Sequence, residues 1–187
     1  MSPPPALRRS GIHRLPKLIA PSECQSILDA SATIERFERT IQMLPKGYGV
    51  GTYHYYREPL PVPAGALRER LYREFAPSDY PKNLAAFWKR CRSAKQERAS
   101  SILICSGKGG VNHPHRDVYG KVWFPFQAVL MLSRRGRDFT GGEFFVEDEA
   151  MGHRRLIAKG NGHRARLTTL GKSGHVLARI LGEIDPH

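Results

Sequence analysis

The sequence predicts an α+β domain that is mainly β, with a layer of helices in its N-terminal half. Three observations lead to this prediction. Short apolar runs of strand length alternate with turn residues between positions 101 and 146. Apolar stripes at helical spacing lie between positions 22 and 94. The chain has 187 residues, 40% of them hydrophobic, which is enough for one sizeable core and too little for two.

The first half of the chain carries the predicted helices. They are expected at residues 23–30, 66–75 and 83–94. Ser22-x-x-Gln25 matches a capping box and marks the start of the first helix. The other two helices follow from apolar residues that recur every three or four positions. Residues 37–43 alternate in polarity and predict a strand, with a helix over residues 34–40 as the alternative.

The remaining regular segments are predicted to be strands. They are residues 53–56, 101–105, 127–132, 142–146, 154–158, 164–168 and 175–180. Each run is short and is bounded by glycine or polar residues, a pattern that favours strands over helices. Residues 107–110 resemble a phosphate-binding loop only superficially, because the spacing of that motif is missing. We therefore interpret them as a turn.

Composition sets the domain organisation. Residues 1–10, rich in proline and then basic, predict a disordered tail, and residues 11–187 predict a single domain. No apolar run reaches the ~20 residues that span a bilayer, and the N-terminus lacks the apolar core of a signal peptide. These features predict a cytoplasmic protein without a membrane partner. Cys24, Cys91 and Cys105 are odd in number and lack C-x-x-C spacing, so reduced, mostly buried thiols are expected.

The net charge is +13, with a pI near 10.1, and such a charge would suit nucleic acid or another polyanion. One basic run is interleaved with an aromatic residue, at positions 88–92, and it fits an ordinary amphipathic helix. Net charge reports on non-specific binding rather than on fold. A generally basic surface is therefore the preferred interpretation, and a small-molecule or peptide substrate is expected in preference to nucleic acid.

The sequence feature with the clearest chemistry is a His-x-Asp pair, His115 and Asp117, ahead of the predicted strand 127–132. Residues two apart on an extended backbone point to the same side, so the imidazole and the carboxylate converge while Arg116 points away. These are two of the three ligands in the 2-His-1-carboxylate set that holds non-haem Fe(II). A lone H-x-D is a weak motif, because such triplets arise by chance.

The surrounding segments make the motif more specific. They are His115-x-Asp117 with Tyr119-Gly120, Phe124-Pro125-x-Gln127, and Asp138-Phe139-Thr140-Gly141-Gly142-Glu143-Phe144. With them the chain resembles a bacterial family of Fe(II)/2-oxoglutarate-dependent oxygenases related to the prolyl 4-hydroxylase catalytic domain, over roughly residues 14–148. The resemblance implies a double-stranded β-helix, or jelly-roll barrel. It also implies a dioxygenase that hydroxylates a C–H bond, a prolyl residue by analogy.

The same resemblance implies Fe(2+) as the cofactor, 2-oxoglutarate and O2 as co-substrates, and ascorbate as an optional addition. In this family a distal histidine completes the metal site begun by His115 and Asp117. His175 lies 58 residues after Asp117 and opens a predicted strand, so it is the preferred third ligand. His153 and His163 remain alternatives.

Relatives hold 2-oxoglutarate through a basic residue about ten positions after the distal histidine. Asp185 stands at that position here, so Arg179, four residues after His175 on the same strand, is the local substitute. Ser106 stands where many relatives have a tyrosine that contacts the co-substrate.

Residues 152–187 diverge from the family and are basic and rich in histidine. This divergence supports a second interpretation from a different functional class. The chain would then be a non-catalytic, truncated or frameshifted jelly-roll remnant or binding module, with its C-terminal strands incomplete.

Overall fold

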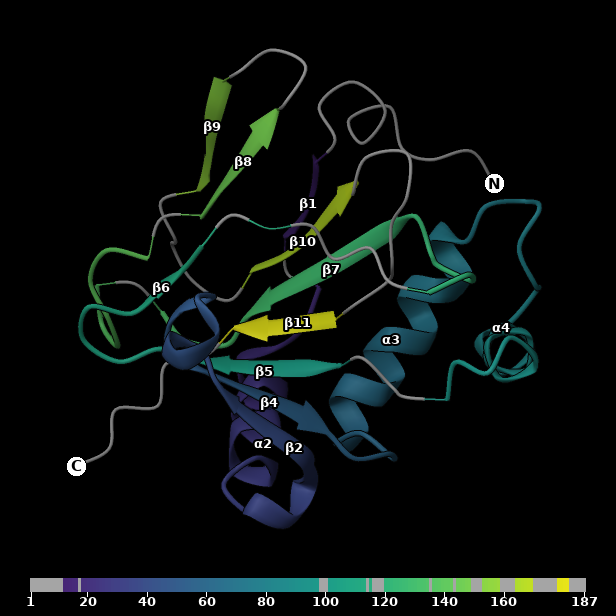
Figure 1. Ribbon diagram of the computed structural model, residues 1–187, viewed down its shortest axis with the longest axis horizontal. Helices are drawn as coiled ribbons and strands as arrows, with labels where there is room; N and C mark the ends of the chain where they lie inside the picture. The colour runs from purple at the N-terminus through teal and green to yellow at the C-terminus, as the bar shows by residue number, and fades with distance from the viewer. Residues whose placement is uncertain are drawn as a thin grey trace.

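Figure 1 shows the computed structural model, in which helices pack against one face of a seven-stranded sheet. The structure describes residues 12–16, 18–97, 101–113, 115, 120–134, 136–142, 144–148, 153–158, 164–169 and 178–181, with side chains up to residue 142 except Pro16. The predicted tail at residues 1–10 lies outside these ranges, as do the turns expected at residues 159–162 and 171–174.

The large sheet has the strand order β1-β10-β7-β11-β5-β4-β2. Its strands are β1 (Ile12–Pro16), β2 (Phe37–Gln42), β4 (Thr52–Tyr56), β5 (Ile102–Cys105), β7 (Phe126–Met131), β10 (Arg164–Thr169) and β11 (Ala178–Leu181). Neighbouring strands are antiparallel, except that β11 runs parallel to both β7 and β5.

Two small antiparallel sheets accompany the large one. The first pairs β3 (Gly49–Val50) with β6 (Val111–Asn112), and the second pairs β8 (Phe144–Asp148) with β9 (His153–Ala158). Every predicted strand corresponds to an observed strand within three residues at either end. Strands β1, β3 and β6 were not predicted. The α+β class with mainly antiparallel pairing is thus confirmed.

All three predicted helices are present as α2 (Pro21–Ala30), α3 (Val62–Phe75) and α4 (Leu84–Ser93). Helix α3 begins four residues earlier than predicted. Pro63 is accommodated in its first turn because an amide hydrogen there has no partner within the helix. The helical alternative for residues 34–40 is wrong beyond the single 3-10 turn η1 (Ile34–Arg36), because the chain then pairs with β4 as β2. A second 3-10 turn, η2 (Leu44–Lys46), precedes β3.

The start of α2 also differs from the predicted capping box. Pro21 occupies the first helical position, and the backbone N–H of Ala20 donates to the Glu23 carboxylate at 2.7 Å. Gln25 instead donates to the Asp29 carboxylate at 2.8 Å. The start signal is therefore the pair Pro21 and Glu23, not Ser22 with Gln25.

The two faces of the large sheet bury different side chains, because successive residues of a strand alternate sides. The helix-covered face forms the main core, which includes Ile27, Leu67, Leu71, Tyr72, Phe87, Leu103, Ala128 and Leu130. The opposite face holds a smaller cluster of Met43, Tyr53, Ile102 and Ile104. His54 pairs with Leu103 across β4 and β5. Tyr53 and His54 therefore lie on opposite faces of the sheet.

An aromatic cluster joins the helices to the start of β7. Phe124, 1% exposed, lies at its centre. Ring centroids 5.1 to 5.9 Å from that of Phe124 belong to Tyr72, Tyr80, Phe87 and Phe126. Aromatic rings at these separations and tilts attract each other beyond the area they bury. The cluster thereby fixes the chain segment that leads from residue 120 into β7.

Arg68 of α3 ties three elements together. Its guanidinium donates to both Glu58 carboxylate oxygens, at 2.6 and 2.9 Å, and to the Ser101 hydroxyl at 3.2 Å. It also lies over the Trp88 ring of α4, 4.5 Å from the centroid. Helix α4 is thus held both by buried aromatic contacts and by this cation.

The three cysteines are free thiols, Cys24 buried and Cys91 and Cys105 half-buried, as expected. Burial raises the pKa of Cys24 and of Cys105 to about 11, so both stay protonated at neutral pH. Among the helices of the described ranges, none combines the length and the apolar character that crossing a bilayer requires.

Candidate functional site

The loop that carries the His-x-Asp pair leaves the small sheet β3–β6. Gly49 pairs with Asn112, and Val50 pairs with Val111. The backbone N–H of His113 donates to the carbonyl of Tyr48 at 2.8 Å, which extends this pairing by one bond. The first end of the loop is thus fixed to the segment that precedes β4.

His115 is exposed, and its imidazole is oriented by the backbone. Its Nδ1 lies 2.7 Å from the carbonyl oxygen of His113. A carbonyl can only accept, so Nδ1 carries the hydrogen, and in the neutral ring the lone pair is then on Nε2. Metal-binding histidines typically donate their other N–H to such a carbonyl or carboxylate. His115 therefore has the tautomer that a metal ligand needs.

Tyr53 connects β4 to the same loop. Its side chain is 5% exposed, and its hydroxyl donates to the carboxamide oxygen of Asn112, the residue before His113. The Tyr48 ring lies 6.3 Å from the Tyr53 ring. This hydrogen bond has no local signal in the sequence. The predicted strand 53–56 was the available signal, but a partner 59 residues away cannot be found from a local pattern.

The far end of the loop is held by Gln96, just after α4. Its carboxamide oxygen accepts from the backbone N–H groups of Lys121 and Val122, at 2.8 and 2.7 Å. Its carboxamide nitrogen donates to the Val122 carbonyl at 2.8 Å. Gly120 adopts φ +81°, and a Cβ there would lie 2.4 Å from Gln96 Nε2. This contact could not be predicted from the sequence, because it depends on the packing of α4 beside the loop.

The other predicted site residues are described in part or not at all. Asp117, His175 and the alternative His163 lie outside the described residues, so the three-ligand site stays a prediction. His153 begins β9 and pairs with Asp148. Arg179 lies in β11, in register with Ile102 and Val129. Within the ranges that the structure describes, no three His, Cys, Asp or Glu residues gather closely enough to hold a metal ion.

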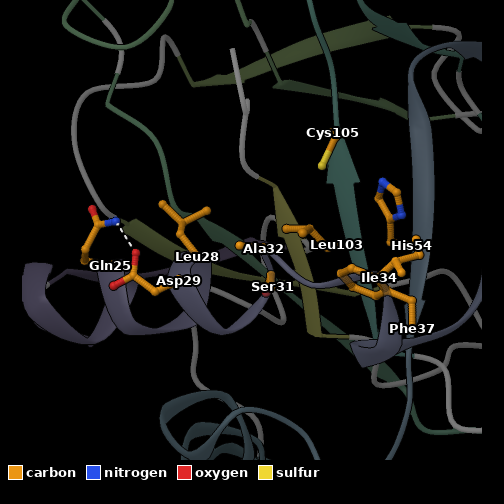
Figure 2. A pocket seen from close by; sticks show the side chains of 10 residues that line it. All are labelled: Gln25, Leu28, Asp29, Ser31, Ala32, Ile34, Phe37, His54, Leu103 and Cys105. Carbon is orange, nitrogen blue, oxygen red and sulfur yellow. Dashed lines mark hydrogen bonds between the residues drawn. The ribbon is translucent and has the colours of Figure 1, made fainter. Parts of the chain in front are cut away.

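A cavity of about 530 Å³ lies between α2 and the strands β2, β4 and β5 (Figure 2). Its lining residues are Gln25, Leu28, Asp29, Ser31, Ala32, Ile34, Phe37, His54, Leu103 and Cys105. Burial lowers the pKa of His54, so this imidazole is neutral at pH 7. The cavity lies on the helix-covered face, whereas Tyr53 lies on the opposite face and binds Asn112 of β6, from which the loop departs. It is therefore separate from the His115 loop.

The pairing of β3 with β6 requires glycine at position 49. Gly49 has φ +132°, and a Cβ there would meet the Val111 carbonyl oxygen at 2.0 Å. We expect Gly49→Ala to separate the two strands, so that the amide hydrogen of His113 exchanges with solvent at least about 10-fold faster. Hydrogen-exchange mass spectrometry of this segment measures the change.

Gly47→Ala is the matched control. Gly47 also has a positive φ, +69°, but no atom lies within 4 Å of its would-be Cβ. An alanine at position 47 would therefore have the strain of a positive φ but no steric clash. Equal exchange rates in the two variants would contradict the role given to Gly49.

Comparison with known proteins identifies relatives of this chain. Residues 51–169, from the residue before β4 through the end of β10, match the model of the Oxygenase-NA family, described as an oxygenase catalysing oxidative methylation of damaged DNA. The match includes the His115 loop and ends within the segment predicted to diverge. Two proteins of Mycobacterium tuberculosis, from strains CDC 1551 / Oshkosh and ATCC 25618 / H37Rv and both described as uncharacterized, are each 30% identical to this chain over 95 residues.

Those alignments cover 44% of this chain and 41% of each mycobacterial protein. The chain thus matches less than half the length of these curated relatives. No solved structure matches this chain.

Proposed function

This chain belongs to the oxygenase family that its residues 51–169 match, and from that membership we propose that it is an Fe(II)- and 2-oxoglutarate-dependent oxygenase acting on methylated bases in nucleic acid. The observation that carries the metal assignment is the bond from His115 Nδ1 to the His113 carbonyl, which leaves the Nε2 lone pair directed away from the backbone partner. His115, Asp117 and His175 would hold the metal, as one carboxylate and two imidazoles.

When bound, the iron supplies the oxidation: 2-oxoglutarate and O2 yield succinate and CO2, one oxygen atom entering succinate and the other a C–H bond of the substrate. The chain itself binds, orients and excludes water. The His113 carbonyl fixes the plane of the His115 imidazole, and the Tyr53–Asn112 bond holds the strand from which the loop departs.

For the fold around this site we propose a jelly-roll barrel. In the large sheet, β7 lies between β10 and β11, which both come later in the chain. Such interleaving of early and late strands is typical of jelly rolls and unlike a simple meander. The small pairs β3–β6 and β8–β9 would then belong to the facing sheet, with the loop of His115 between the sheets.

For the co-substrate we propose Arg179 as the anchor. In β11 it is in register with Ile102 and Val129, both 5% exposed and both on the face away from the helices. An arginine at that position can grip a carboxylate with two parallel hydrogen bonds.

For the substrate we propose nucleic acid in place of the peptide expected from the sequence. The family description names damaged DNA, and a net charge of +13 supports binding to a polyanion. A methyl group on a base nitrogen, once hydroxylated, is released as formaldehyde. The reaction would therefore restore the unmethylated base.

The test incubates the purified chain with Fe(II), 2-oxoglutarate and a single-stranded oligonucleotide carrying an N-methylated base. We expect succinate and formaldehyde in equal amounts, with neither product from the His115→Ala variant. An unmethylated oligonucleotide and a proline-rich peptide serve as controls. Succinate formation that depends on the peptide and not on the oligonucleotide would refute the proposed substrate class.

A binding module without turnover is the second candidate. Two features favour it. Strand β11 runs parallel to both of its neighbours in an otherwise antiparallel sheet, and Ser106 stands where the family resemblance implies a tyrosine. In this case the chain would bind the oligonucleotide, and succinate would form no faster than it does with Fe(II) in the absence of the protein.

A further inference from the structure

Helix α4 and its flanks carry a surface rich in cations, which we call the α4 patch. It consists of six exposed residues: Lys82, Lys89, Arg90, Arg92, Lys95 and Lys121. The sequence from Tyr80 to Gln96 contains no acidic residue, with Asp79 and Glu97 just outside it. Figure 1 shows α4 at the outer edge of the molecule, on the side opposite β6. The patch therefore faces solvent along a whole helix.

Helix stability alone does not account for these charges. Cations in the last turn of a helix interact favourably with the helix dipole, which would explain Arg90 and Arg92. The same dipole disfavours a cation at the first turn, yet Lys82 directly precedes the N-cap residue Asn83. Among the residues that the structure describes, none of the six patch cations forms an ion pair. Their charge is thus not neutralised within this part of the protein.

The opposite face of α4 holds the helix firmly in place. Leu84 and Phe87 are buried, and Trp88 packs under the Arg68 guanidinium. The outward positions between the cations are filled by small side chains, Ala85, Ala86 and Ser93. A polyanion can therefore approach the helix closely, and the cations are presented on a rigid support.

The patch is also joined to the His115 loop. Gln96 follows the last helical turn and binds the backbone of Lys121 and Val122. Lys121 thereby belongs both to the patch and to the segment that returns from the His-x-Asp pair. The patch thus extends to a residue that is six positions after His115 in the chain.

We propose that the α4 patch binds the phosphodiester backbone of the nucleic acid and leads it toward the His115 loop. This inference rests on the proposed function for its substrate class. It adds the surface of the protein that binds the nucleic acid. Phosphate contacts position a nucleic acid without reading its sequence. Each contact releases counterions, so the binding should weaken with salt.

The test measures binding of a fluorescent single-stranded oligonucleotide to the full chain by anisotropy, across a range of salt concentrations. Lys89→Gln/Arg92→Gln should lower the affinity by about 25-fold at about 0.1 M salt and reduce the salt slope by about 1.4, as expected for two lost contacts to single-stranded phosphate. The thermal unfolding midpoint should fall by only a few degrees, because both side chains are exposed and only Arg92 loses a favourable interaction with the helix dipole.

The control variant is Arg36→Gln/Lys108→Gln, which removes the same charge from exposed positions on η1 and the β5–β6 turn. Equal losses in the two variants would overturn the patch in favour of general charge attraction. Unchanged binding by the Lys89/Arg92 variant would overturn it too, as would equally tight, patch-dependent binding of poly-glutamate.

The His115→Ala variant should bind the oligonucleotide with the same affinity as the parent protein. If the parent protein binds the oligonucleotide through the α4 patch but releases no product, the patch is supported and the proposed catalytic function is wrong.

Discussion

Replacing His115 with alanine is expected to lower the affinity for Fe(II) by well over 10-fold, and by about 100-fold if the metal has three protein ligands. Partners that only orient a ligand already matter by about 10–100-fold, so a direct ligand should matter at least as much. The side chain is exposed, so the unfolding midpoint of the metal-free protein should change little. Anaerobic Fe(II) titration with and without 2-oxoglutarate measures the affinity, and Asp117→Ala should behave in the same way.

His54→Gln is the matched control for this experiment. His54 is half-buried and lines the cavity on the helix-covered face, away from the loop. Its replacement should leave Fe(II) binding intact. If His115→Ala binds Fe(II) as tightly as the parent, His115 is not a ligand and the metal assignment falls.

Replacing Phe124 with alanine is expected to cost about 3–5 kcal/mol in the free energy of unfolding, as is usual for a buried aromatic residue. Phe124 is 1% exposed and contacts four other aromatic rings, which cannot all close the resulting cavity. The loss is a large part of a typical total of about 5–15 kcal/mol. Urea denaturation followed by tryptophan fluorescence reports it.

Phe124→Leu provides the comparison, because it keeps most of the apolar volume and should cost clearly less. The exposed pair Arg137–Asp138 provides a second one, since Arg137→Gln should leave the denaturation midpoint unchanged. A Phe124→Ala variant with the parent midpoint would mean that the aromatic cluster does not anchor β7.

The sequence predicted the elements whose signals are local. The stripe of Leu67, Leu71 and Phe75 identifies α3 because every fourth side chain of a helix faces the same side. The apolar run within residues 127–132 identifies β7 in the same direct way, although the strand begins and ends one residue earlier than predicted. The capping error at α2 is also local, since Ser22 and Pro21 are both acceptable start signals and proline occupied the first position.

The parts of the fold and of the candidate site that could not be predicted from the sequence depend on contacts between distant segments. Strands β3 and β6 are two residues each, too short for any periodic pattern. They form because the fold brings Gly49 opposite Asn112, which is 63 positions later in the chain. Gln96 is an ordinary polar residue in the sequence. Its hydrogen bonds to Lys121 and Val122 form because the fold brings the end of α4 beside a segment that lies 25 positions later in the chain.

Hydrogen bonds hold both ends of the loop that carries His115, and this limits which sequence changes the loop can accept. His113 is fixed to Tyr48 at one end, and Lys121 is fixed to Gln96 at the other. A chain segment that is held at both ends has less conformational entropy than a free segment. The contacts of the surrounding fold offset the free-energy cost of closing such a loop. A residue added or deleted between the tethers would shift His115 relative to these fixed points, a change that replacing the His115 side chain does not make. The position of His115, the proposed metal ligand, is thus set by contacts with the rest of the fold on both sides.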